Sequence, residues 1–108
     1  MKKVWVDGNP WKIAIVTENG RSLVHALLKE HTNNESEYIA VIAALNEELG
    51  DLEIISDSQL VINQLNHLWK IKEERLRELA VKAWGLAEGR QVIFTWRKGD
   101  NPAGKILG

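Results

Sequence analysis

Three acidic residues stand where packing alone would not favour them. Asp7 ends one short segment of strand character, and Asp57 ends another. Glu37 precedes Val41 by four residues and Leu45 by eight, so it lies in line with the buried stripe of a predicted helix. A carboxylate that points inward costs free energy unless another group compensates it. The three acids are therefore candidates for chemistry.

Together these acids would make a site for hard cations. The carboxyl ends of parallel strands meet in the crevice where α/β sheets bind ligands, which would bring Asp7 and Asp57 close together. Converging carboxylates repel one another, and shared protons or divalent cations relieve the repulsion. The sequence has no cysteine and no histidine cluster near these acids, which favours Mg²⁺ or Mn²⁺ over zinc.

Each acid taken singly has a structural explanation that the sequence leaves open. Asp57 precedes a predicted helix, where aspartate is a good N-cap. Asp7 is followed by glycine, a pair typical of turns. Glu37 lies near a helix start, where a negative charge favours the helix dipole. The occurrence of all three at one predicted sheet edge favours the metal site.

The elements that would position these acids follow from the apolar pattern. Turn signals separate three short strands, Val4–Val6, Lys12–Thr17 and Ser22–Leu28, which predicts an antiparallel meander. From Asn34 the apolar positions recur at helical spacing as far as Leu49, and Gly50 is a stop signal. The remaining predicted elements are a strand at Leu52–Ser56, a helix at Leu60–Leu65, a long helix from Lys72 to near Gly89, a strand at Gln91–Trp96 and a short helix from Pro102.

This order of elements predicts an α/β fold. Three antiparallel strands plus two parallel strands, joined through helical crossovers, give a mixed five-stranded sheet flanked by helices. The 108 residues are expected to form a single domain, residues 1–108. No apolar run approaches the roughly 18 residues of a membrane span, and no signal peptide is recognised. With no cysteine in the chain, we expect a cytoplasmic protein without membrane contact.

The charge balance limits how the chain could bind nucleic acid. A formal net charge of -1 argues against binding through bulk electrostatics, so any contact must be local. Two basic groups are candidates: Lys70, Lys72, Arg75 and Arg77, and then Arg97, Lys98 and Lys105. Both groups are also explained as solvated faces of helices and loops.

The five tryptophans are explained mainly by packing. Those in predicted strands and helices or beside them are expected to pack against the core or a sheet face: Trp5, Trp11, Trp84 and Trp96. Trp69 lies between two predicted helices, beside Lys70 and Lys72, where contact with a base or sugar is the alternative.

The residues around the three acids resemble a known family. The segments Val6–Gly8, Thr32–Tyr38 and Ser56–Gln59 resemble, in order, successive motifs of type 1 ribonuclease H. The resemblance implies that Asp7 bridges two divalent ions, Mg²⁺ or Mn²⁺, and that Glu37 and Asp57 complete the ligand set. It further implies an endoribonuclease that hydrolyses the RNA strand of an RNA/DNA hybrid.

The same resemblance implies where the hybrid binds. The candidate substrate-binding residues are Thr32, Asn33, Asn34, Gln59 and Asn63. Of these, the amides of Asn34, Gln59 and Asn63 match positions that contact the minor groove of the hybrid. There the ribose 2′-hydroxyl distinguishes RNA from DNA.

Several departures from the family pattern bear on activity. The closing motif has Gly104 where the family has a fourth acid, and Asp100 is the alternative candidate ligand. Glu35 stands where the family often has a phosphate-binding arginine, and the glycine-rich loop is cut to Gly8–Pro10. The segment before the last helix has no histidine, and Leu65–Ile71 joins two helices without the basic extension of some members.

These departures keep two other functions open. One is a non-catalytic nucleic-acid-binding module with the ribonuclease H-like fold, and the other is a ribonuclease H-like nuclease with a different substrate.

Overall fold

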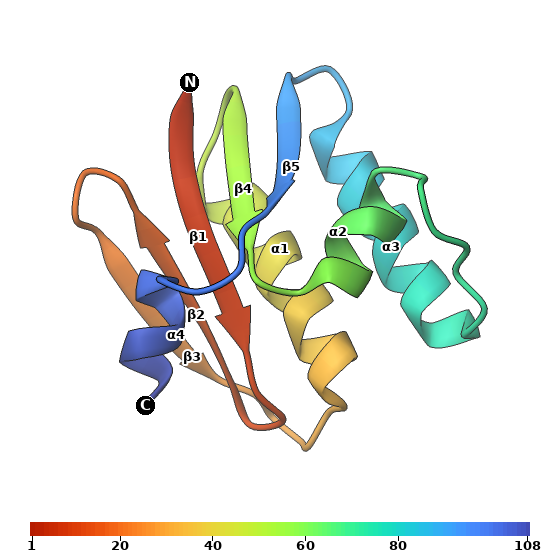
Figure 1. The fold of residues 1–108 in the computed structure, drawn as a ribbon, viewed down its shortest axis with the longest axis horizontal. Coiled ribbons are helices and arrows are strands. Elements are labelled where there is room, and N and C mark those ends of the chain that lie inside the picture. The colour runs from red at the N-terminus through yellow and green to blue at the C-terminus, as the bar shows by residue number, and fades with distance from the viewer.

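A computed structural model describes residues 1–108, in which five strands form one mixed sheet of order β3-β2-β1-β4-β5 (Figure 1). Strands β1 (Lys2–Gly8), β2 (Lys12–Thr17) and β3 (Ser22–Ala26) pair as an antiparallel meander. Strands β4 (Leu52–Ser56) and β5 (Val92–Trp96) add on the other side of β1 in parallel. The predicted fold class is confirmed.

Helices cover both faces of this sheet. Helix α1 (Asn33–Glu47) packs on one face across β1 and β2, and α3 (Glu74–Ala87) packs against α1. Helix α2 (Gln59–Leu65) follows β4 and lies beside β5, while the short α4 (Pro102–Leu107) lies on the opposite face over β1 and β2 (Figure 1). No helix combines the length and the apolar character that a membrane crossing requires.

Alternation along β1 divides its side chains between the two faces. Val4 and Val6 are fully buried in the main core beneath α1. Trp5 points to the other face, where it packs with Ala103 and Leu107 of α4. Asp7 continues this second series, so the strand delivers a carboxylate at its end rather than another core residue.

Several boundaries differ from those predicted. Strand β1 runs beyond Val4–Val6 at both ends because β2 and β4 pair with it on either side. Strand β3 ends at Ala26, two residues before the predicted Leu28.

Helix α1 ends at Glu47, and Leu49, which its spacing placed on the apolar stripe, is 79% exposed. The side chain of Arg90 explains why the helix ends there. Its guanidinium donates to the carbonyls of Leu45 at 3.0 Å and of Gly50 at 2.7 Å, and also to that of Glu48.

Candidate active site

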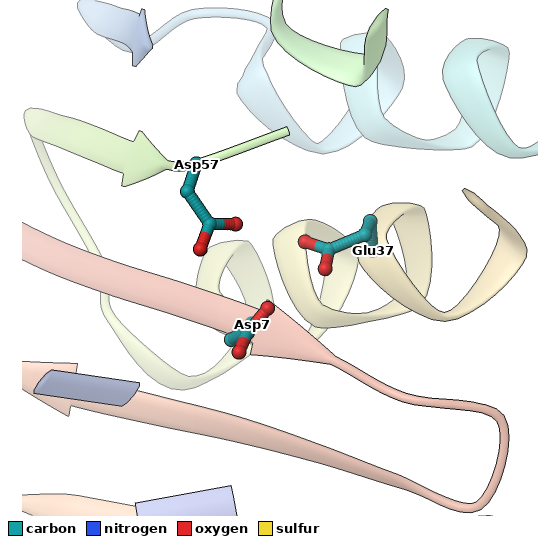
Figure 2. A group of neighbouring side chains, drawn as sticks. All are labelled: Asp7, Glu37 and Asp57. Atoms are coloured by element: carbon teal, nitrogen blue, oxygen red, sulfur yellow. The ribbon is translucent and has the colours of Figure 1, made fainter. Parts of the chain in front are cut away.

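The side chains of Asp7, Glu37 and Asp57 converge at one edge of the sheet. Each offers one carboxylate oxygen, and these three oxygens lie within 4.8 Å of one another. They come from the end of β1, the second turn of α1 and the residue after β4, and they face a common space (Figure 2). The structure thus brings together the three acids that the sequence singled out.

Strand pairing places the two aspartates. Strands β1 and β4 are parallel neighbours with Trp5 opposite Ile55, so both chains reach the same edge of the sheet before Asp7 and Asp57. Beyond Asp7, Gly8 allows the strand to touch α1, because a Cβ atom there would lie 2.7 Å from the main chain of Ser36. This approach lets the Gly8 N–H donate to Oε1 of Glu37 at 3.3 Å.

The start of α1 shows that Glu37 is not the acid that serves the helix dipole. Thr32 is the N-cap, and its hydroxyl accepts from the N–H of Glu35 at 3.1 Å. The Glu35 carboxylate accepts in return from the N–H of Thr32 at 3.0 Å, which completes a capping box and lowers the pKa of Glu35. Glu37 lies one turn deeper, is buried, and faces the two aspartates.

The structural explanations for the two aspartates fail in the same way. Ser58, not Asp57, caps α2, because its hydroxyl accepts from the N–H of Val61 at 3.3 Å. The turn after β1 is closed by the side chain of Asn9, which accepts from the N–H groups of Trp11 and Lys12 at 2.9 and 2.8 Å. Asp7 itself lies within the strand, opposite Ala14.

Contacts around the acids fix their orientation. The hydroxyl of Ser56 donates to Oε2 of Glu37 at 3.5 Å, so both oxygens of this carboxylate have a donor. The indole N–H of Trp96 donates to the main-chain carbonyl of Asp57 at 3.1 Å. The sequence had indicated Ser56 only as part of a motif and Trp96 only as a packing residue, since a serine inside a strand and a tryptophan at a strand end carry no signal of their own for such a contact.

The proximity of the acids changes their protonation. Burial raises the pKa of Glu37 to about 9, with further contributions from its hydrogen bond to Asp7 and from the charges of Asp7 and Asp57. The pKa of Asp57 is also raised, first by loss of solvent around its carboxylate and then by the charge of Asp7. Without a cation, the Glu37 carboxyl therefore holds a proton at neutral pH.

Comparison with known proteins places this arrangement in a family. A family model described as RNase H matches residues 3–102. This chain belongs to the ribonuclease H family. The resemblance to type 1 ribonuclease H that the three motifs predicted is confirmed.

Two curated relatives are similar to part of the chain. Ribonuclease HI of Halobacterium salinarum is 39% identical over 79 residues, which cover 69% of this chain and 37% of that protein. The bifunctional protein Rv2228c of Mycobacterium tuberculosis is 39% identical over 70 residues, which cover 60% of this chain and 19% of that protein. The chain thus spans well under two thirds of the length of either relative.

Solved structures share the fold. RNase H1 from Halobacterium salinarum NRC-1 superposes with a TM-score of 0.76 at 30% identity, covering 90% of this chain and 85% of that one. The N-terminal RNase H domain of rv2228c from Mycobacterium tuberculosis was solved as a fusion with maltose binding protein. It superposes with a TM-score of 0.71 at 28% sequence identity, covering 90% of this chain and 88% of that one. LC11-RNase H1 in complex with an RNA/DNA hybrid superposes with a TM-score of 0.82 over 100% of both chains. At 24% sequence identity, this likeness shows only that the two chains share a fold.

The divalent ions implied by the ribonuclease H family fit the residues present. The converging donors are all carboxylate oxygens, the ligands that Mg²⁺ and Mn²⁺ prefer. None of the ion pairs in the structure involves Asp7, Glu37 or Asp57, so no protein cation compensates the cluster.

The fourth acid of the ribonuclease H pattern is absent at a position that faces the site. A Cβ atom on Gly104 would lie 2.9 Å from Oδ2 of Asp7, so position 104 is directed at the cluster. The alternative candidate, Asp100, is exposed and is not among the acids whose oxygens converge.

The candidate substrate-binding residues of this ribonuclease H-like chain lie at the starts of two helices and within one. Asn33 and Gln59 are exposed at the first positions of α1 and α2, and Thr32 precedes Asn33 as the N-cap. Asn34 is half-buried and lines a hollow of about 290 Å³ together with Lys70 and Lys72.

Asn63 lies farther along α2 and is half-buried. Its carbonyl accepts from the N–H groups of Leu68 and Trp69 at 2.8 and 3.2 Å, which shapes the connection to α3.

Two of the tryptophan expectations are wrong. Trp5 and Trp84 pack against buried residues as predicted, but Trp11 is 56% and Trp96 is 41% exposed. Trp11 lies in the turn between β1 and β2, and Trp96 ends the edge strand β5, so neither has an element to cover it. Trp69 is 44% exposed.

Proposed function

We propose that the protein is a divalent-metal-dependent endoribonuclease that hydrolyses the RNA strand of RNA/DNA hybrids. The observation that carries this proposal is the convergence of three carboxylate oxygens, from Asp7, Glu37 and Asp57, within 4.8 Å. Membership of the ribonuclease H family supports the proposal, as does the shared fold with an RNase H1 solved in complex with an RNA/DNA hybrid.

In this proposal Asp7, Glu37 and Asp57 hold two ions, Mg²⁺ or Mn²⁺. When bound, these ions supply Lewis-acid stabilisation of the negative charge that develops as a phosphodiester is hydrolysed. Asp7 would contribute to both ion positions. The donors on Glu37, from Gly8 and Ser56, hold its carboxylate toward the aspartates before any ion arrives. The indole N–H of Trp96 holds the main chain at Asp57 in place by donating to its carbonyl.

The polar residues at the helix starts would recognise the hybrid. The amides of Asn34 and Gln59 each offer a donor and an acceptor, which suits a ribose 2′-hydroxyl and the base edges of a minor groove. Asn33 and Asn63 would add further amide contacts. Thr32 would contribute mainly by holding the first turn of α1, since its hydroxyl already accepts from Glu35.

A second candidate function is a module that binds hybrids without cleaving them. The observation that favours it is Gly104, which leaves Asp7 without a carboxylate neighbour from α4. A nuclease that acts on another nucleic acid is the third candidate.

One cleavage assay separates these functions. Purified protein is incubated with labelled RNA/DNA hybrid, double-stranded RNA or double-stranded DNA, in Mg²⁺, in Mn²⁺ or in EDTA. We expect cleavage of the RNA strand of the hybrid with either metal, none in EDTA, and none with Asp7→Asn. Binding of the hybrid without cleavage under every condition would favour the non-catalytic module, and cleavage of another duplex would favour the third candidate.

A further inference from the structure

The loop of residues 97–101, between β5 and α4, crosses the edge of the sheet that carries the acids (Figure 1). At one end, the N–H of Arg97 donates to the carbonyl of Ser56 at 2.9 Å. At the other, the side chain of Asn101 donates to the carbonyl of Val6 at 2.9 Å. Ser56 and Val6 are the residues directly before Asp57 and Asp7, so the loop is attached beside each aspartate.

The attachment at Asn101 is built into the structure. Asn101 is buried, and its side-chain oxygen accepts from the N–H groups of Ala103 and Gly104 at 2.9 and 3.4 Å. One side chain thus ties the start of α4 to β1. Between the two attachments, Gly99 and Asp100 both have positive φ, 75° and 47°, a conformation that glycine adopts readily and most other residues adopt rarely.

This loop and the helix after it carry three basic residues. Arg97 and Lys98 are exposed in the loop, and Lys105 is exposed on α4 next to Gly104, where a Cβ atom would lie 2.9 Å from Oδ2 of Asp7. None of the three takes part in an ion pair. They lie beside an acidic cluster without neutralising it, so their charges stay available to a ligand.

In the other basic group of the sequence, the two arginines are already paired with carboxylates. Arg75 lies 3.8 Å from a carboxylate oxygen of Glu35, and Arg77 lies 3.0 Å from one of Glu74. Since the whole chain has a formal net charge of -1, a polyanion must be held by local cations, and those of the 97–105 segment lie on a stretch of chain that is attached beside Asp57 and Asp7.

We propose that Arg97, Lys98 and Lys105 bind backbone phosphates of the strand that is cleaved, on either side of the bond held at the carboxylates. This inference rests on the proposed function and deepens it by naming the residues that bind the backbone of that strand. An arginine guanidinium can hold two phosphate oxygens at once, and lysine acts as a point charge. The loop needs little ordering on binding, because it is already attached at both ends.

The test uses the salt dependence of binding, which reports phosphate contacts directly. Equilibrium binding of an RNA/DNA hybrid is measured in EDTA, so that no cleavage occurs, across a series of NaCl concentrations. The variants are Arg97→Ala, Lys98→Ala, Lys105→Ala and the triple variant. The matched control is Lys82→Ala, which removes an exposed and unpaired lysine from the side of α3.

We expect each single variant to reduce the slope of log K against log salt by about 0.9, and the triple variant by roughly three times that amount. The affinity of each variant for the hybrid at low salt should fall severalfold, by the same factor for hybrids of different nucleotide sequence. Lys82→Ala and the conservative Lys98→Arg should leave the slope unchanged. A purely structural role for the loop would lower the melting temperature of the variants and leave the slope unaltered.

The failures of the two proposals are distinguishable. If the wild type binds and cleaves the hybrid but the triple variant keeps the wild-type slope, the phosphate assignment is overturned and the proposed function stands. If the wild type neither binds nor cleaves the hybrid in EDTA, Mg²⁺ or Mn²⁺, the proposed function fails and the phosphate assignment fails with it.

Discussion

The backbone of Gly104 lies against the carboxylate of Asp7, so closely that a Cβ atom at position 104 would be 2.9 Å from Oδ2. Only the end of the Asp7 side chain stands in the way, and a rotation of that side chain would admit a larger residue. Position 104 is therefore where an additional ligand would join the cluster.

We predict that Gly104→Asp raises the affinity for Mg²⁺ on the order of tenfold, about 1.4 kcal/mol, because Mg²⁺ depends on few protein ligands. The wild type should be more active with Mn²⁺ than with Mg²⁺. Isothermal titration calorimetry measures the affinity, and a cleavage assay compares the metals. Asp100→Asn is the control and should change neither, since Asp100 lies outside the converging group. A large loss of affinity in Asp100→Asn would instead make Asp100 a ligand.

Asp7→Asn should abolish cleavage while leaving the fold intact. The substitution removes a ligand and also removes like-charge repulsion with Asp57, so the metal-free protein should melt at the wild-type temperature or slightly above it. Thermal melting in EDTA measures this. Unfolding of the variant would show that Asp7 has a structural role.

The metal-free protein should lose stability as the pH rises. The pKa of buried Glu37 is raised in the folded state, so its contribution is complete below the ordinary value of 4.5 and is lost as the pH rises toward about 9. We expect the melting temperature in EDTA to fall by at least several degrees between about pH 5 and pH 8, since each pH unit in this range removes up to ~1.4 kcal/mol and ~1 kcal/mol corresponds to roughly 4–8 °C in a small domain. Glu37→Gln should flatten this dependence, and Mg²⁺ should restore stability at the higher pH. A steeper dependence in Glu37→Gln would contradict the assignment.

Trp96→Phe should weaken the site through the main chain of Asp57. The variant keeps an aromatic ring but loses the indole N–H donated to the Asp57 carbonyl, which costs about 1 kcal/mol. Thermal melting and metal titration measure the two effects. Trp11→Phe is the matched control, because Trp11 is also exposed and makes no side-chain hydrogen bond in the structure. Equal effects of the two substitutions would remove Trp96 from the site.

Cleavage should require ribose 2′-hydroxyls, which the amides of Asn34 and Gln59 would contact. Double-stranded DNA is expected to be inert. The double variant Asn34→Ala/Gln59→Ala should lower hybrid cleavage by about 10-fold or more, since an unpaired polar group at an interface costs roughly 1–3 kcal/mol. Unchanged cleavage by the double variant would exclude this contact.

The sequence predicted the parts of the fold that depend on periodicity. Alternation in β1 and helical spacing in α1 were enough to place Val6 and Val41 in the core and Glu37 in line with them. The parallel neighbours β1 and β4 then brought Asp7 and Asp57 together, as expected.

Features that depend on contacts between distant residues were not predictable. The end of α1 is set by Arg90, more than forty residues away along the chain, so the local spacing wrongly extended the helix to Leu49. The exposure of Trp96 depends on β5 being the edge strand, and its bond to Asp57 depends on the register between β4 and β5. The sequence offered Asp57 as a cap of α2, whereas Ser58 caps it in the structure; both residue types are good caps, so the local sequence does not distinguish them.

Arg90 also donates to the carbonyl of Leu86 at 3.3 Å, so one guanidinium joins the ends of α1 and α3 to the turn before β4. The capping box fixes the N-terminal end of α1, so both ends of the helix are held by hydrogen bonds. We therefore expect that Glu37 cannot shift along the helix axis. Ion binding would then be accommodated by side-chain rotation alone. Amide protons along the middle of α1 that exchange through local opening should accordingly exchange equally slowly in EDTA and in Mg²⁺.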